Sequence, residues 1–296
     1  MAGKVQTAKA DQLRAKAEEN EPDLRKAIKE AVAQIKDTMV LAGVTRALNE
    51  DDAEAALEAT GIDKLKEELS GPLTAGVIAA LLTGAGLGRE ELPSGIARTA
   101  PAFDLQDAAT QRWIRQNGAR QVTQISGGSR RAIQSIIADQ LASGEGARAA
   151  ARRIRDVIGL TNPQQAALQR LREAMSEAGA TKAVVDRTMA ARAERMLDER
   201  AFAIARNESF TAVAQGRQMY WEQLVANGEL DPATLRKWIT AEDEFVCPIC
   251  RPMHNQIRGL NEPFDKGTGG TTLTTPAHVT CRCSVILVAP GRPPEE

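Results

Sequence analysis

Apolar side chains recur every three or four residues through much of the chain, the spacing that places them on one face of a helix. The clearest case runs from Glu21 to about Leu48 and predicts an amphipathic helix with Pro22 in its first turn. The apolar face of this helix consists of Leu24, Ile28, Ala31, Ile35 and Met39. The rest of the protein must therefore cover one side of it.

Glycine and proline divide the following residues into further predicted helices. Shorter helical pieces lead to Gly71-Pro72, which is expected to break the pattern before an apolar, buried helix over residues 73–87. A loop rich in proline and glycine at residues 92–101 predicts a domain boundary near residue 100. The next breaker is Ser126-Gly-Gly-Ser129, whose last serine is expected to cap a helix. In this part of the chain we expect helices at about 104–125, 130–143 and 147–158.

The start and stop signals become more complete after residue 160. A capping side chain and a first-turn proline at Thr161-Asn162-Pro163 begin a helix that Gly179 ends. Residues 182–226 are almost free of breakers and predict one long helix that ends at Asn227-Gly228. Beyond it, Trp238-Ile239 and residues 284–288 predict strands that flank a segment rich in glycine, threonine and proline.

The predicted fold is therefore mainly α, with a small mixed α+β module at the C-terminal end. We divide it into an N-terminal helical region (1–100), a central helical domain (101–230) that contains the long helix, and a C-terminal module (231–296). Aromatic residues make up only 3% of the chain, so aliphatic side chains must fill the core between helices.

The net charge of −1 conceals an uneven distribution. Residues 1–70 carry 15 acidic and 11 basic side chains, whereas residues 106–155 carry nine arginines and three acids. The arginines are Arg112, Arg115, Arg120, Arg130, Arg131, Arg148, Arg152, Arg153 and Arg155. They either form a solvated helical surface or neutralise phosphates of DNA. Because Trp113 is the one aromatic residue near them, such binding would be electrostatic and indifferent to base sequence.

The chain shows no sign of export or of a membrane span. Its first residues lack the apolar core of a secretory signal, so we expect a cytoplasmic protein. The longest apolar run, Leu73–Gly88, is interrupted by glycines and is shorter than the roughly 20 residues that a bilayer requires. All four cysteines lie between Cys247 and Cys283, and in a reducing compartment this clustering favours metal binding over disulfides.

The candidate metal ligands form two short clusters. Cys247-Pro-Ile-Cys250 is followed 28 positions later by His278-Val-Thr-Cys281-Arg-Cys283. These residue types and spacings predict a structural zinc site that staples the C-terminal module. Zinc takes four ligands, so one of the five candidates is redundant.

Two arrangements of these ligands stay open. Cys281 and Cys283 face the same side of an extended strand and can both bind, which leaves His278 as a supporting or catalytic group. Alternatively, His278 binds together with one of them. A disulfide or free buried thiols are the alternatives to zinc, and His254, in a polar loop, is expected to be exposed and is left out of the set.

Enzymatic chemistry is disfavoured by the sequence. A catalytic zinc needs an open coordination position, and four filled positions leave none. The chain contains no nucleophile elbow, phosphate-binding Walker loop, dinucleotide fingerprint or His-Glu-x-x-His motif. The alternatives to a non-enzymatic protein are a zinc-containing nuclease with His278 or His254 as base and a DNA-binding zinc module.

Several segments together resemble the phage Mu F-like head morphogenesis family. They are Trp238-Ile-Thr-Ala-Glu-Asp243, Cys247-Pro-Ile-Cys250 and Pro276-Ala-His278-Val-Thr-Cys281-Arg-Cys283, preceded by Ile204-Ala-Arg206-Asn207-Glu208-Ser209. The stretch at residues 204–209 is similar to an Ala-Arg-Thr-Glu-Thr stretch of the family. The family usually has Pro-Asn where this chain has Val279-Thr280. The resemblance covers residues 200–285 well and 104–288 loosely.

The resemblance implies a minor capsid protein, present in few copies, that associates with the portal protein and the procapsid or scaffold interior and can leave with the DNA. It implies a place in the virion, inside the capsid or at the portal vertex, after assembly in the host cytoplasm. The nine arginines at residues 112–155, and not the resemblance, suggest non-specific contact with packaged DNA. Arg206 and Glu208 are two apart on a helix and do not face each other. They are either solvated or paired with the C-terminal module, where Trp238 and Asp243 are the further candidate contact residues.

Overall fold

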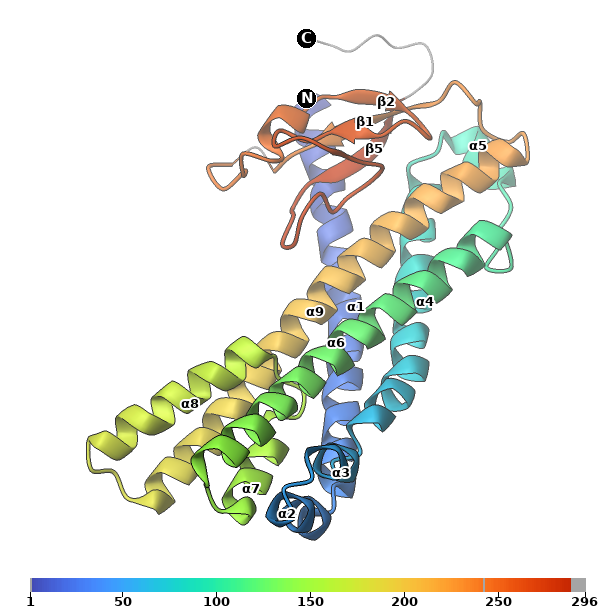
Figure 1. Ribbon diagram of the computed structural model, residues 1–296. Coiled ribbons are helices and arrows are strands. Elements are labelled where there is room, and N and C mark those ends of the chain that lie inside the picture. The colour runs from blue at the N-terminus through green and yellow to red at the C-terminus, as the bar shows by residue number, and fades with distance from the viewer. Residues whose placement is uncertain (1, 242, 289–296) are drawn as a thin grey trace. The chain divides into compact units, whose positions relative to one another are not determined.

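The computed structural model describes residues 2–241 and 243–288, and helices make up most of them (Figure 1). The helices are α1 (Ala2–Thr38), α2 (Leu41–Asn49), α3 (Ala53–Ala59), η1 (Ile62–Lys64), α4 (Leu65–Glu90), α5 (Ser94–Thr99), α6 (Ala108–Ser143), α7 (Ala147–Val157), α8 (Asn162–Glu177), α9 (Lys182–Ala226) and η2 (Arg251–Met253). The strands are β1 (Leu235–Ile239), β2 (Ile257–Gly259), β3 (Phe264–Asp265), β4 (Thr271–Thr272) and β5 (Ser284–Val288). The mainly α class with a small strand region near the C-terminal end is confirmed. Residues 289–296, which the predicted C-terminal module includes, lie outside the described residues.

The chain divides into two compact units, each built from segments that are distant in sequence. The first unit contains the chain up to Asp23, Ala75–Ile114 and the residues from Ala205 onward. The second contains Leu24–Thr74 and Arg115–Ile204. Helices α1, α4, α6 and α9 contribute residues to both units. The three-part division at residues 100 and 230 stays a prediction.

The predicted apolar face of the first helix is confirmed, whereas both predicted ends of this helix are wrong. All five of its apolar positions are buried, from Leu24 to Met39. The helix itself runs from Ala2 to Thr38, because the buried stripe extends back through Leu13 and Ala17. Pro22 therefore lies inside the helix and not in its first turn. The helix stops because Val40 adopts an extended conformation and begins α2.

Two predicted breaks are wrong because burial overrides the local signal. Helix α4 continues through Gly71-Pro72, and its buried stripe passes the break without a change of phase. This stripe consists of Leu65, Leu69, Leu73, Val77 and Leu81. Helix α6 likewise continues through residues 126–129. Ser129 does not cap a helix; its hydroxyl donates to the carbonyl of Ile125 one turn back, at 3.1 Å.

Other start and stop signals are confirmed. Helix α8 begins at Asn162, where the Gln164 side chain accepts a hydrogen bond of 3.0 Å from the backbone N–H of Thr161. Helix α9 spans residues 182–226 as predicted, and Gly228 follows it in the left-handed conformation with φ of +75°. The loop expected at residues 92–101 contains the short helix α5.

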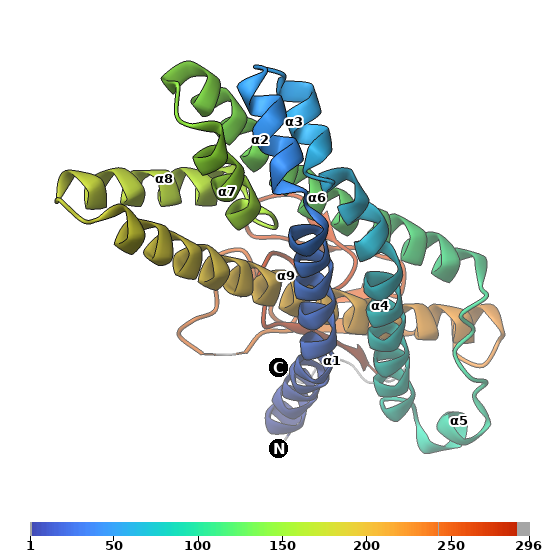
Figure 2. The same ribbon diagram turned by 90° about the horizontal axis from the view of Figure 1, so that it is seen from below.

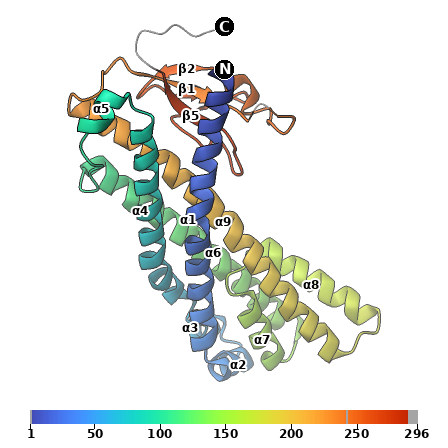
Figure 3. The same ribbon diagram turned by 180° about the vertical axis from the view of Figure 1, so that it is seen from behind.

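The first unit has a core in which α4 and α9 touch backbone to backbone. A methyl group on Gly84 of α4 would overlap the carbonyl of Val213 on α9, and one on Gly216 of α9 would overlap the carbonyl of Leu81 on α4. Helix α1 lies beside α4 in this unit (Figures 2 and 3), with Asn20 donating to the Thr83 hydroxyl at 3.3 Å. The backbone contact between α4 and α9 leaves no room for a side chain at Gly84 or at Gly216.

The strands form a small antiparallel sheet in the order β2-β1-β5 (Figure 1). The central strand β1 pairs Trp238 with Val285 and Ile239 with Ser284 of β5. A separate two-stranded ladder joins β3 and β4. The strand predicted at Trp238-Ile239 is confirmed and starts three residues earlier, and the strand at residues 284–288 is confirmed at both ends.

The second unit contains α2, α3, α7 and α8 together with parts of the four long helices. Figure 2 shows α2 and α3 beside α7. Gly159 ends α7 with φ of +91°, and a Cβ there would meet Val32 at 2.9 Å, so only glycine fits this turn.

One described helical stretch, Ile62–Glu90, is long and apolar enough to cross a membrane by length and composition. Of its most apolar window, 44% is buried within the protein, and core helices pass the same test. This stretch is weak evidence for a span.

Candidate metal centre

The first ligand cluster is a tight turn that aims two sulfurs in one direction. The backbone N–H groups of Cys250 and Arg251 both donate to the carbonyl of Cys247, at 3.1 and 2.9 Å. The N–H of Gly267 donates to the carbonyl of Ile249 at 3.0 Å and braces the turn from outside. A side chain on Gly267 would collide with Pro252, so the brace depends on glycine.

The second ligand cluster is another turn, which leads into β5. The N–H of Cys281 donates to the carbonyl of His278 at 3.2 Å, and Thr280 takes the left-handed conformation with φ of +63°. Cys281 and Cys283 then stand on either side of Arg282 at the start of the strand. The turn places an imidazole and a sulfur three residues apart, the same spacing as in the first cluster.

The two turns bring all five candidate ligands together. The Cys247 and Cys250 sulfurs lie 3.1 and 3.2 Å from Nε2 of His278, and the Cys250 and Cys281 sulfurs lie 3.8 Å apart. Two groups of three result, Cys247 with Cys250 and His278, and Cys250 with Cys281 and Cys283. Cys250 belongs to both groups. Each of these groups of three could hold a metal ion.

His278 is oriented as metal-binding histidines usually are. Its Nδ1 lies 2.7 Å from the carbonyl oxygen of Val279, so that nitrogen carries the proton and donates it. The lone pair is then on Nε2, which faces the sulfurs of Cys247 and Cys250. A backbone carbonyl that fixes the tautomer in this way is a common support for a metal ligand.

Hydrogen bonds among the buried thiols favour one thiolate, that of Cys281. Hydrogen bonds from Cys250 and Cys283 lower the pKa of Cys281 to about 2, because both thiols donate to its thiolate. As the donor in the first of these bonds, Cys250 has a raised pKa. A cation bound among the sulfurs would stabilise further thiolates, so the arrangement suits a positively charged ion.

Trp238 closes the buried side of the cluster. It is completely buried, and its ring packs against Phe264 with centroids 5.3 Å apart. The indole N–H has no hydrogen-bond acceptor among the described residues. The tryptophan that we singled out from sequence as a contact residue lies in the same buried cluster as Cys250, Cys281 and Cys283.

Asp243 and Arg282 tie the two ligand-bearing segments together. The guanidinium of Arg282 donates to both carboxylate oxygens of Asp243, at 2.6 and 2.7 Å, and these bonds lower the pKa of Asp243. The same guanidinium lies 5.7 Å from the ring centre of Phe245. This ion pair joins the loop before Cys247 to Arg282, the residue between Cys281 and Cys283.

The other predicted contact residues lie on α9. Arg206 is 3.7 Å from Glu18 of α1, so its ion-pair partner is not in the C-terminal module. Glu208 is buried and accepts a hydrogen bond of 3.2 Å from its neighbour Asn207. His254 directly follows η2 and is partly buried, so the expectation that it is exposed is wrong; its Nδ1 accepts a bond of 3.2 Å from the N–H of Thr240, the residue after β1. Within the described residues, His254 belongs to neither group of candidate ligands.

Two buried arginines that sequence reasoning missed hold the module against α9. Arg236 of β1 is fully buried and donates to the carbonyls of Gly259, Glu262 and Leu273 at 2.6 to 3.2 Å. It also donates to the Gln218 side chain of α9 at 2.8 Å, and burial lowers its pKa to about 10. Arg236 thus organises the loops between the two ligand clusters.

The second is Arg217 of α9, which forms a buried ion pair with Glu91. The two side chains are 1% and 7% exposed and 2.9 Å apart. Arg217 also donates to the Ser284 hydroxyl of β5 at 3.0 Å. The sequence gives no signal for either arginine, because Arg217 is followed by Gln218 and Arg236 by Lys237.

Comparison with known proteins gives one match. A family model described as Phage Mu protein F like protein matches residues 131–286, slightly more than half of the chain, and this range contains all five candidate ligands. No curated protein and no solved structure matches the chain significantly.

Proposed function

This chain belongs to the Phage Mu protein F like family, and we propose on that premise that it is a head morphogenesis protein of a tailed bacteriophage. The observation that carries the proposal is a family match that includes the entire ligand cluster. The types and spacing of the five candidate ligands are more restricted by their chemistry than other residues of the chain. A family match that includes them therefore connects the family with this site.

Within head assembly we propose the role of a minor capsid protein that binds the portal protein and the procapsid or scaffold interior. Its place is then the virion, at the portal vertex or inside the capsid, with ejection alongside the DNA as a further part of the proposal. Exposed arginines support non-specific contact with packaged DNA. They are Arg112, Arg115, Arg120, Arg131, Arg148, Arg152 and Arg155.

For the metal centre we propose a structural zinc ion bound by Cys247, Cys250, His278 and Cys281. Two sulfurs on one tetrahedral zinc stand about 3.8 Å apart at the usual bond length, and the Cys250 and Cys281 sulfurs show this separation. The tautomer of His278 presents Nε2 to the same point. Nitrogen and sulfur donors in two short turns are the set that zinc prefers.

Cys283 is then the redundant candidate and supports the site from behind. It lies within the same group as Cys250 and Cys281, and it is buried in one cluster with Trp238. Groups that hydrogen-bond to bound thiolates orient them and tune the site. This assignment chooses the arrangement in which His278 binds together with one cysteine of the second cluster.

The proposed zinc is not catalytic. Four protein ligands fill a tetrahedral shell, which leaves no position for a substrate or a reactive water. The proposal therefore predicts no metal-dependent cleavage of duplex DNA, in the wild type or in His278→Ala.

The test combines metal content with partner binding. Native mass spectrometry of the purified chain is expected to show one zinc per chain, and sedimentation with purified portal protein is expected to carry the chain into the portal fraction. Cys247→Ser is expected to lose the zinc, whereas Arg206→Gln, distant from the ligands in sequence, keeps it. Absence of zinc would refute the metal assignment. Failure to sediment with portal or procapsids would refute the assembly role.

A further inference from the structure

A second polar site lies in the second unit, whereas the metal ligands belong to the first. A hollow of about 170 Å³ opens between α7, α8 and α9. Its charged lining consists of Arg152, Arg153, Arg155, Arg172, Lys182, Asp156 and Asp186. Five cations face two carboxylates, so the hollow carries an excess of three positive charges.

The carboxylates do not neutralise the cations nearest to α7. Asp186 accepts hydrogen bonds from Arg172 and from Lys182, both at 2.9 Å. Asp156 is 4.0 Å from Arg155. Arg152 is exposed and forms no ion pair among the described residues. The uncompensated positive charge is therefore concentrated on the α7 side.

Arg153 supplies a donor that no protein group accepts. The residue is only 8% exposed, and its Nη1 pairs with Glu145. Its Nη2 is buried without a hydrogen-bond partner among the described residues. A buried guanidinium N–H without an acceptor is costly, and such groups usually have a partner. This unsatisfied donor belongs to a residue that lines the hollow.

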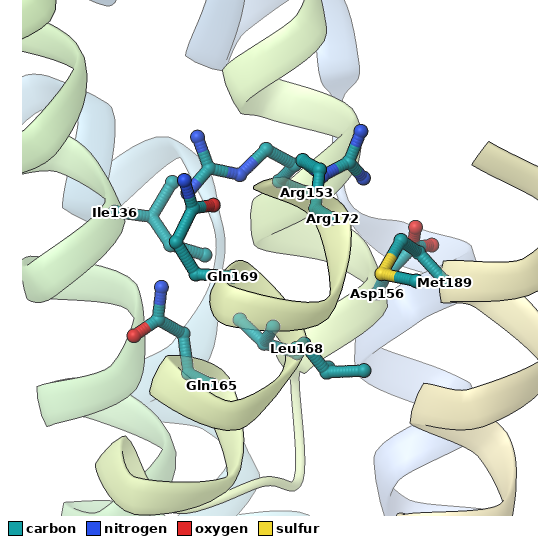
Figure 4. Close-up of a pocket in the computed structure, with 9 residues that line it drawn as sticks. Ile136, Arg153, Asp156, Gln165, Leu168, Gln169, Arg172 and Met189 are labelled. Carbon is teal, nitrogen blue, oxygen red and sulfur yellow. The ribbon is translucent and has the colours of Figure 1, made fainter. Parts of the chain in front are cut away.

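A smaller chamber adjoins the hollow through shared residues. Figure 4 shows it bounded by Arg153, Asp156, Arg172 and two glutamines of α8, Gln165 and Gln169. Its volume of about 20 Å³ is the size of one water molecule. The Oε1 atom of Gln169 has no partner among the described residues, so a water is expected to fill this chamber. A neutral water does not compensate the excess positive charge, so the larger hollow is the place where an anion could do so.

We propose that the hollow between α7, α8 and α9 is a binding site for a phosphate-type oxyanion. Guanidinium groups on converging helices are suited to such anions, because they offer paired donors with fixed geometry. The anion is either free inorganic phosphate or a phosphate group of a larger molecule. This inference deepens the proposed contact of Arg152 and Arg155 with packaged DNA, on which its nucleic-acid source rests, and does not depend on the metal centre.

The test measures binding of inorganic phosphate to the full chain, against chloride at equal ionic strength, by calorimetry and by the melting temperature. Arg152→Gln is expected to weaken phosphate binding about tenfold, the effect of one lost charged hydrogen bond. Arg187→Gln removes an exposed arginine of α9 that does not line the hollow, and it is expected to leave the affinity unchanged.

A variant that gains affinity separates the proposal from simple damage to the fold. Asp156→Asn removes a negative charge from the lining and is expected to tighten phosphate binding at least about fivefold. Loss of structure cannot produce this result. Absence of phosphate binding in the wild type, or equal weakening by Arg152→Gln and Arg187→Gln, would overturn the proposal.

A parallel titration with a short DNA duplex identifies the source of the phosphate. If Arg152→Gln weakens binding of both phosphate and duplex more than Arg187→Gln does, the site takes backbone phosphates of nucleic acid. If only the phosphate titration responds in this way, the site takes a free ion. Both results support the oxyanion site, whereas a duplex that responds equally to both variants, with no phosphate binding, contradicts it.

Discussion

The ion pair between Arg217 and Glu91 is the most deeply buried charge pair among the described residues, and we predict a large loss of stability when it is broken. Arg217 donates to Glu91 at 2.9 Å and to Ser284 at 3.0 Å, and its guanidinium lies 5.3 Å from the Trp221 ring centre. The second oxygen of Glu91 accepts the N–H of Leu287 at 3.3 Å. The pair therefore joins α9, the end of α4 and β5.

The change Glu91→Gln keeps the size of the side chain and removes its charge. Arg217 then stays buried, with its charge uncompensated, and burial already lowers its pKa. Removal of one partner of a buried pair typically costs about 3–5 kcal/mol. For a chain of this size the corresponding drop in melting temperature is on the order of 10 °C. A loss of this magnitude is a large part of the stability of an ordinary domain.

The assay is urea unfolding followed by tryptophan fluorescence, since Trp221 and Trp238 both lie in the first unit. Asp265→Asn is the matched control, because it breaks an exposed pair with Arg258 in the same unit and is expected to cost less than about 1 kcal/mol. Adding Arg217→Met to Glu91→Gln removes the stranded charge and should recover part of the loss. Equal effects of Glu91→Gln and Asp265→Asn would refute the reasoning.

Three further predictions test the ligand assignment, the helix contact and a buried carboxylate. Cys281→Ser is expected to abolish zinc binding while Cys283→Ser retains it with weaker affinity, by about 10-fold or more; metal titration of both variants distinguishes them, and the reverse order would show that Cys283 is the ligand. Gly84→Ala is expected to destabilise the first unit by about 3 kcal/mol or more because the added methyl meets backbone, whereas Gly86→Ala in the same helix has open space and should stabilise by up to about 1 kcal/mol; similar melting temperatures would contradict the close contact. Burial raises the pKa of Asp156 above 3.8, so the stability of the fold falls as pH rises through the window above that value. Asp156→Asn should therefore stabilise the protein at pH 7 and lose this advantage in acid. An equal effect of the substitution at both pH values would exclude titration of Asp156 as the cause.

The sequence predicted helices well where burial and local signals agree. The apolar face from Leu24 to Met39 and the long helix at residues 182–226 needed only periodicity and caps. The break predicted at Gly71-Pro72 failed because this breaker lies on the exposed side of a continuous buried stripe, whereas in the other failed break Ser126 and Ser129 are themselves buried inside α6. Pro72 is exposed, and the packing of Leu69 and Leu73 outweighs the local preference for a break. Tertiary packing cannot be read from the breaker itself.

The site was predictable in its ligand types and not in its supports. Cysteine and histidine are rare, and their spacing limits the geometry, so two short clusters predict one centre. Arginine is common on helix surfaces, and nothing in the residue type separates Arg217 or Arg236 from Arg206, which is exposed and weakly paired. The difference arises only from which elements pack over each side chain.

The same comparison explains how so polar a C-terminal segment becomes ordered. Between its two ligand clusters the chain offers few apolar side chains, and its buried core includes Tyr220, Trp221 and Leu224 of α9. Arg236 donates to three loop carbonyls, those of Gly259, Glu262 and Leu273, and so joins separate parts of the segment. A metal ion among the sulfurs would fix the ends of the same loops. The segment is therefore ordered by groups that its own apolar content does not supply, because α9 completes its core and the Arg236 guanidinium joins its loops.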